Sequence, residues 1–346
     1  MRQHFYAALA MAIAVPAAAG GIERRQQNRQ RAGEDRERSG CGIPREPGAP
    51  VEGTGIGCTA PGGPGMERSS RTEAGWYNRH VTPPVIISAS RRTDVPAFHA
   101  DWFSACLSSG TATFRNPYSG RPAAVSLERS RVAAFVFWTR DPRPFFPVLA
   151  RLEREGFPSV FHVTVTGLSR EIEPFVPPLA QAVSAFRRLS ETIGPRRVLW
   201  RFDPLLPGEE TQRLVERFDT VSKALAGLSV RCTVSLAHPY RKSVRATRHL
   251  PGIWEPSEGL RASVERIVAL GRARGFTMLS CCTPLLAGWG VPPGACVDGD
   301  SLRSLYPAAD IPASPSPVRP GCLCRSSRDI GSYHTCRHGC LYCYAA

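Results

Sequence analysis

Short apolar runs alternate with amphipathic stretches from residue 85 onward, and this alternation sets the expected fold. Six runs are continuously apolar, as strands buried on both faces are, and they cover 85–90, 133–139, 161–166, 197–203, 230–236 and 276–282. Helical spacing of apolar residues lies between them, over 98–107, 145–155, 178–194, 210–227 and 259–275. The pattern predicts an α/β fold, with a parallel-stranded (β/α) partial barrel of about six repeats or an open doubly wound sheet.

Charged side chains follow the predicted strands where each strand ends. Arg91, Arg92 and Asp94 come after the first strand, and Arg201 and Asp203 end the fourth. The carboxyl ends of the strands build the active site in βα folds, so we predict that these five residues are catalytic or bind substrate. The arginines are candidate clamps for a carboxylate or another anion. The alternative is a salt bridge from these arginines to Asp94 or Asp203.

Residues 1–80 lack apolar periodicity, and we expect a single folded domain over 81–346. The start of the chain resembles a secretory signal, with a basic residue, an apolar stretch and small residues. The alternative, which we favour, is an upstream extension with translation beginning at Met66 or later. The cysteines near the end of the chain suggest a thiolate site, which oxygen would damage outside the cytoplasm. We therefore predict a cytoplasmic protein. No apolar run reaches the roughly 18 residues of a membrane helix.

Composition leaves the class of partner open. The 346 residues, 42% of them hydrophobic, suffice for one core of about 200–250 residues. The net charge is +15, and Lys223 and Lys242 are the only lysines. This excess of arginine is explained either by codon bias or by a face that binds an anion such as nucleic acid.

Cysteines concentrate at the end of the chain. Five of the twelve lie in the cysteine-rich segment 320–346, which is typical of metal binding in a reducing compartment. Cys336, Cys340 and Cys343 have the spacing CxxxCxxC, so that one loop can wrap three corners of a [4Fe-4S] cluster. Gly339 permits the tight backbone that this requires. The alternative is zinc, although zinc sites more often use paired CxxC turns.

The remaining cysteines suggest a second site. Cys322 and Cys324, joined by Cys296 and by Cys281 or Cys282, would supply four ligands for a second iron–sulfur cluster or for zinc. The alternative is a set of buried reduced thiols. Cys106 and Cys232 fall on apolar element faces, where we expect core residues.

The CxxxCxxC spacing with an aromatic residue before the last cysteine resembles the signature of radical S-adenosylmethionine (SAM) enzymes. That resemblance implies an open iron that chelates SAM and an electron that cleaves SAM to a 5'-deoxyadenosyl radical. Tyr342 is the aromatic residue here and would pack against the cluster. Asp329 and Asp203 are candidates to hydrogen-bond the ribose or the amino group of SAM.

An ordered set of motifs from about residue 85 to the end resembles the bacterial family named domain of unknown function 1848. The motifs are "IISASRRTDVPAF", "FRNP", "FVFWTRDP", "VTGLSREIEP", "VLWRFDP" and "CLCRSSRDIGSYHTCRHGCLYCYA". The resemblance implies a radical-SAM-like protein with its cluster motif moved to the C-terminus, where the segment would fold back over the strand ends. The chain departs from the family's Cys-Ala-Glu after the sixth strand, because Thr283 and Pro284 follow Cys282.

We therefore expect a radical SAM-type enzyme that acts on an unknown substrate and takes electrons from a reductant such as flavodoxin or ferredoxin. One alternative is a zinc- or cluster-containing protein that binds nucleic acid. Another is an iron–sulfur protein for electron transfer or sensing that has no SAM site. P-loop, GxSxG, HExxH and GxGxxG motifs are absent, which argues against the hydrolase and kinase classes that they mark.

Overall fold

The computed structural model describes residues 83–117 and 119–345. The predicted extension over residues 1–80 lies outside the described residues. The described part of the domain begins at Pro83.

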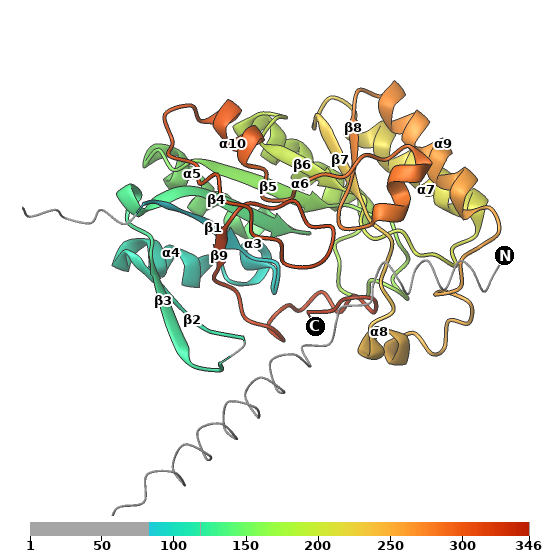
Figure 1. Ribbon diagram of the computed structural model, residues 1–346, viewed down its shortest axis with the longest axis horizontal. Coiled ribbons are helices and arrows are strands. Elements are labelled where there is room, and N and C mark those ends of the chain that lie inside the picture. The colour runs from blue at the N-terminus through green and yellow to red at the C-terminus, as the bar shows by residue number, and fades with distance from the viewer. Residues whose placement is uncertain (1–82, 118, 346) are drawn as a thin grey trace, which may run out of the picture. The chain divides into compact units, whose positions relative to one another are not determined.

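Seven strands form one parallel sheet in the order β8-β7-β6-β5-β4-β1-β9 (Figure 1). The strands are β1 Val85–Ala89, β4 Val132–Thr139, β5 Ser159–Thr164, β6 Val198–Arg201, β7 Arg231–Val234, β8 Thr277–Ser280 and β9 Ser327–Asp329. All six predicted strands are confirmed. In the described part of the chain β8 and β9 are the two edges, so the sheet is open, as in a partial barrel.

The five predicted helices are also confirmed. They are α4 Ala100–Ser109, α5 Phe146–Arg154, α6 Leu179–Ile193, α7 Thr211–Leu225 and α9 Leu260–Ala273. The sequence pattern missed the short elements α3 Val95–Phe98, α8 Arg241–Ala246 and α10 Gly299–Leu305, the hairpin of β2 Thr111–Arg115 and β3 Pro122–Ser126, and β9. These elements are too short or too polar to show a period in the sequence.

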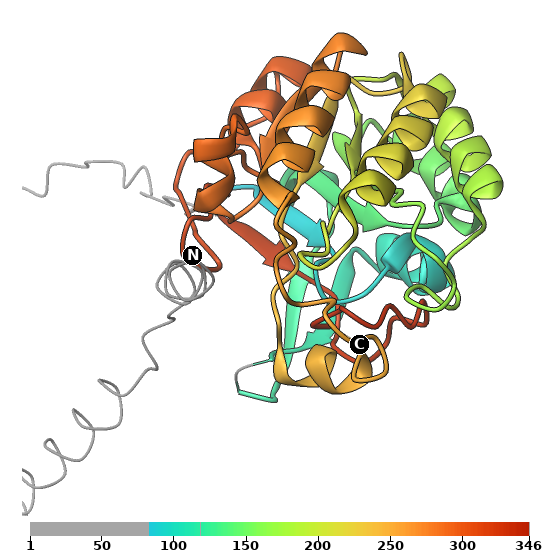
Figure 2. The ribbon, with the colours of Figure 1, turned by 90° about the vertical axis from the view of Figure 1, so that its right-hand side faces the viewer.

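One face of the sheet, which we call the helix face, carries the main core. Phe135 and Phe137 of β4 point to this face, as do Phe161 of β5 and Trp200 of β6, and all four are fully buried. Helices α6, α7 and α9 lie side by side over it in Figure 2. Each such aromatic side chain contributes about 1.5–3 kcal/mol through removal of its apolar surface from water.

The opposite face, which we call the cysteine face, has a different composition. Because side chains alternate along a strand, the neighbours of the buried phenylalanines, Trp138 and His162, point here, and Arg201 does so from β6. A second core covers this face, built from Ala134, Val136, Val160 and residues of the segment 281–324, α10 included. In the described part of the chain, this segment rather than a long helix therefore covers the cysteine face.

Strand β9 fixes the path of the C-terminal segment. It pairs with β1, and the Asp329 carboxylate accepts hydrogen bonds from Ser88 Oγ (2.7 Å), Ser90 Oγ (2.7 Å), the Arg91 amide (2.9 Å) and the Gly331 amide (3.0 Å). The Asp329 side chain is only 8% exposed. A buried carboxylate is tolerated because it is hydrogen-bonded on both oxygens.

Removal of this carboxylate is expected to destabilise the edge of the sheet. In Asp329→Ala four donors lose their acceptor, and we expect the free energy of unfolding to fall by about 3–5 kcal/mol. Denaturant unfolding measures the loss, and the exposed Asp310→Ala is the matched control. Equal stability of the two variants would contradict this account of β9.

Candidate functional site

The segment 336–344, which we call the terminal cysteine loop, lies across the carboxyl ends of the strands. Tyr344 Oη donates to the Arg91 carbonyl after β1 (2.6 Å), and the Leu341 amide donates to the Ile172 carbonyl after β5 (3.0 Å). Ser243, in the helix that follows β7, donates to the backbone carbonyl of residue 342 (3.1 Å). In Figure 1 the red C-terminal segment runs past β9 toward α8. The predicted return of this segment over the strand ends is confirmed.

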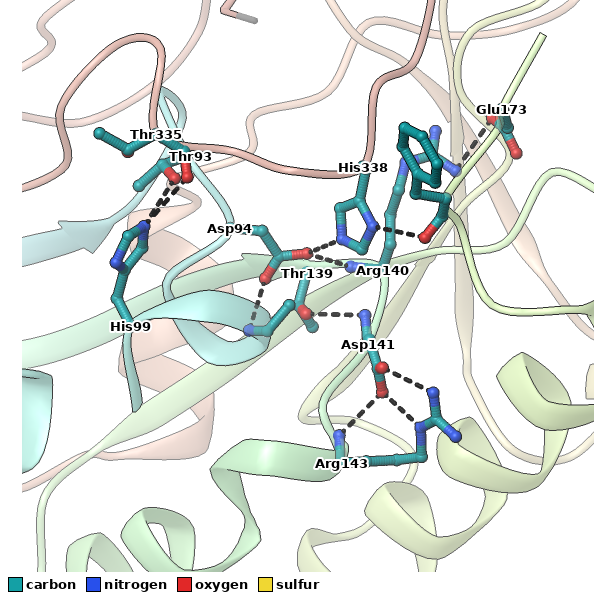
Figure 3. Close-up of polar contacts among 12 residues, drawn as sticks. Thr93, Asp94, His99, Thr139, Arg140, Asp141, Arg143, Glu173, Thr335 and His338 are labelled. Carbon is teal, nitrogen blue, oxygen red and sulfur yellow. Dashed lines mark hydrogen bonds and ion pairs between the residues drawn. The ribbon is translucent and has the colours of Figure 1, made fainter. Parts of the chain in front are cut away.

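Asp94 is the junction between the loop and the sheet (Figure 3). One carboxylate oxygen accepts from the Arg140 amide (2.7 Å) and from His338 Nε2 (2.8 Å), and the other accepts from the Ala97 amide (2.9 Å) and so caps α3. Both Asp94 and His338 are buried. The sequence suggested Asp94 as a catalytic residue. In this structure it positions three segments, which are α3, the residues after β4 and the terminal cysteine loop.

A second polar group, which sequence reasoning missed, holds Tyr342. Arg140 Nη1 pairs with Glu173 Oε1 at 2.9 Å, and Thr166 Oγ1 donates to Glu173 Oε2 at 2.7 Å. The Tyr342 hydroxyl donates to Glu173 and accepts from Arg140. Burial raises the pKa of Tyr342 well above its usual value, so the hydroxyl remains a donor.

The three thiols of the terminal cysteine loop share one electrostatic environment. A thiolate at Cys336 or Cys343 would raise the pKa of Cys340, whereas the Arg140 cation lowers it. Burial raises the pKa of Cys340 to about 12. Gly339 has φ +66°, and a Cβ there would lie 2.9 Å from Phe175, so the turn requires glycine on two counts.

Five other thiols meet in a group that we call the five-cysteine ring: Cys281, Cys282, Cys296, Cys322 and Cys324. The Sγ of Cys281 lies 3.3 Å from that of Cys296 and 3.9 Å from that of Cys282. Side-chain hydrogen bonds join Cys322 to Cys282 and to Cys324, and Cys324 to Cys296. The structure therefore brings together every residue of the second set that the sequence suggested. Cys106 and Cys232 lie in the main core instead, as expected.

N–H donors point at the sulfurs of this ring. Arg201 Nη1 donates to Cys296 Sγ at 3.0 Å, and the Val297 amide donates to Cys324 Sγ at 3.3 Å. Arg319 Nη2 lies 3.8 Å from Cys281 Sγ. Hydrogen bonds from Cys281 and Cys324 lower the pKa of Cys296, and Arg201 lowers it further.

Arg201 also forms an ion pair with Asp203, which accepts a hydrogen bond from Ser235. The salt bridge that the sequence left as an alternative is therefore present, together with a thiol contact that was not foreseen. Arg92 behaves similarly, since it donates to the Gly331 carbonyl at 3.3 Å and lies 3.7 Å from Asp329. Arg92 and Asp329 thus hold the β9 edge in this structure.

A stack of three side chains runs between the two thiol groups. The Arg91 guanidinium lies 5.1 Å from the Trp138 ring, which stacks on His162 at 5.2 Å, and His162 Nε2 lies 2.8 Å from the Cys296 carbonyl. Burial lowers the pKa of His162 to about 3, so the ring is neutral and Nε2 donates. Within the described residues, His162 Nδ1 and Arg91 Nη2 are buried polar atoms without a hydrogen-bond partner.

A family model described as Domain of unknown function (DUF1848) matches residues 86–345. The chain belongs to this family. A search of curated proteins finds none that matches at a significant level. The family resemblance of the motifs is therefore confirmed, and the description of DUF1848 carries no activity.

Two further findings bear on what this DUF1848 domain holds. Among the described residues, no group of three or more His, Cys, Asp or Glu side chains is arranged so that it could hold a metal ion as it stands. In the same residues, no helix has the length and apolar character that a membrane crossing requires.

Loss of the Tyr342 hydroxyl is expected to loosen the terminal cysteine loop. Tyr342→Phe leaves buried Glu173 and Arg140 without their shared partner, and we expect a loss of about 1–3 kcal/mol in unfolding free energy. Hydrogen exchange of residues 336–345 should quicken in parallel. Tyr333→Phe, at a residue that is 40% exposed, is the control and should leave both quantities unchanged.

Proposed function

We propose that this protein is a radical SAM-type enzyme, with a [4Fe-4S] cluster on Cys336, Cys340 and Cys343 and an as yet unknown substrate. The observation that carries the proposal is the position of the terminal cysteine loop, which contacts the segments after β1, β5 and β7. In βα folds, active sites lie at the carboxyl ends of the parallel strands.

The donor set fits the proposed cluster. A four-iron cluster has four corners, and the loop offers three thiols in the order CxxxCxxC, with no fourth cysteine between residues 336 and 345. One corner would then remain for SAM. When bound, the cluster would pass an electron to SAM and so cleave its sulfonium.

The chain's own residues would orient and shield this site. Burial raises the pKa of Cys340, and the nearby Arg140 cation opposes that effect and so favours the thiolate form of this residue. Glu173 and Arg140 fix the Tyr342 hydroxyl, and with it the ring before the last cysteine. Asp94 holds the same loop from its other side through His338.

Arg91 is our candidate for the carboxylate of SAM. Its backbone carbonyl accepts from Tyr344, so it lies against the loop, and its buried Nη2 has no partner among the described residues. A guanidinium binds a carboxylate through two parallel N–H groups. Asp329 supports a SAM contact less well, because its oxygens already accept four internal hydrogen bonds.

The electron source in this proposal is a flavodoxin- or ferredoxin-type reductant. The net charge of +15 favours association with an acidic partner. A cytoplasmic location, where thiols stay reduced, is part of the same proposal.

Anaerobic reconstitution with iron and sulfide tests the proposal. We expect about four irons per chain at the loop, cluster absorbance, and reductive cleavage of SAM. Cys340→Ala should lose all three, whereas Cys106→Ala, which removes a buried core thiol, should retain them.

Other outcomes of this experiment would overturn the proposal. A cluster that never cleaves SAM would favour electron transfer or sensing. Zinc on the loop, with nucleic-acid binding that weakens steeply with salt, would favour the nucleic-acid protein.

A separate measurement addresses Arg91. In Arg91→Met the carboxylate clamp is lost while the apolar stem is kept, and we expect the dissociation constant for SAM to rise roughly 10–100-fold. Arg154→Met removes an exposed arginine and should not change SAM affinity. Equal affinities in the two variants would remove Arg91 from the site.

A further inference from the structure

The five-cysteine ring is not used by the proposed function. Its sulfurs come from three places in the chain: the end of β8, the loop before α10, and the segment before β9. Four of the five thiols are buried and only Cys282 is half-buried. Five thiols from three separate parts of the chain therefore meet in one place.

Two sulfur separations in the ring are close to the spacing of ligands around a tetrahedral ion. With Zn–S bonds of about 2.3 Å, two sulfurs at a tetrahedral angle lie about 3.8 Å apart. The separations of 3.3 Å and 3.9 Å from Cys281 Sγ to its neighbours bracket that value. A four-iron cluster would need its thiolates spread around a much larger body.

The backbone also brings the adjacent sulfurs to one side. In an extended strand Cys281 and Cys282 would point to opposite faces. Cys282 instead has φ +49°, which is unusual for a residue with a side chain. This left-handed residue turns both thiols into the ring.

N–H groups around the five-cysteine ring would stabilise negatively charged sulfur atoms. The N–H groups of Arg201, Val297 and Arg319 point at three different sulfurs. Four thiolates around a divalent ion carry a net charge of about −2, which the buried guanidinium of Arg201 and the exposed guanidinium of Arg319 offset. Hydrogen bonds from N–H groups to ligand atoms are the usual support for such a site.

We propose that four of the five sulfurs of the five-cysteine ring bind one zinc ion, at a site separate from the terminal cysteine loop. The four thiols release their protons to solvent on binding. Rotation about the Cα–Cβ bonds brings the sulfurs from a ring of pairwise contacts to a shell around one point. The ion ties the segment 281–324 to the cysteine face, which no long helix covers.

Zinc content of the full chain, purified without oxygen, tests this proposal. We expect about one tightly bound zinc per chain in the wild type and in Cys340→Ala, and loss of that zinc in the double variant Cys281→Ala/Cys296→Ala, which leaves only three thiols in the ring. Cys232→Ala, which removes a fully buried thiol elsewhere in the core, should keep its zinc. Because Cys340→Ala disables only the terminal cysteine loop, failure of this proposal and failure of the SAM proposal are separable.

A second measurement needs no variant and so does not depend on whether the double variant folds. Cobalt added to the metal-free wild type should give the strong visible absorption of tetrahedral thiolate coordination, and zinc should displace it. The proposal is overturned by absence of zinc and of this spectrum. It is also overturned by a Cys281–Cys296 disulfide in the anaerobic protein, or by iron and sulfide that remain in Cys340→Ala and vanish in the double variant.

Discussion

Two buried carboxylates determine where the chain lies from β9 to the terminal cysteine loop. Asp329 gathers donors from β1 and from the turn after β9, and Asp94 gathers the end of β4 and His338 of the terminal cysteine loop. A carboxylate removed from water is costly unless several N–H or O–H groups replace its hydration. Each contact therefore depends on the others, and the loop has one place in which these donors and acceptors are all satisfied.

The division of the sheet into two faces follows from the alternation of side chains on the strands. Phenylalanine and tryptophan fill the helix face, where long amphipathic helices supply the partner surface. On the cysteine face, Trp138, His162 and Arg201 take the alternate positions. Polar residues there require partners, and the segment 281–324 supplies them as sulfurs and backbone carbonyls. The fold thus packs one face against long helices and covers the other with a cysteine-containing segment.

Sequence patterns predicted the elements that have a strong period and missed those that do not. The six strands were predictable because each is a continuous apolar run, whereas β9, with the sequence Ser-Arg-Asp, has no apolar residue at all. Arg140 and Glu173 lie in recognised motifs, but only the fold shows that both meet Tyr342. The spacing of the cysteines limited the possible ligand sets without choosing among them. The choice between ligand sets depends on which cysteines come together in the folded chain, and the spacing in the sequence does not determine this.

The two thiol groups differ in ways that match different tasks, although one layer of side chains separates them. Arg91, Trp138 and His162 form that layer, with Tyr344 bonded to the Arg91 carbonyl on one side and His162 bonded to the Cys296 carbonyl on the other. The terminal cysteine loop keeps two half-exposed thiols, as a site that must admit a cofactor requires, whereas most of the five-cysteine ring is buried, as in a closed structural site. Because the layer contacts both groups, substitutions within it would act on both, and their effects would not add. Cys340 and Cys296 are not part of this layer, and each belongs to one thiol group, so substitutions at these two residues separate the two sites.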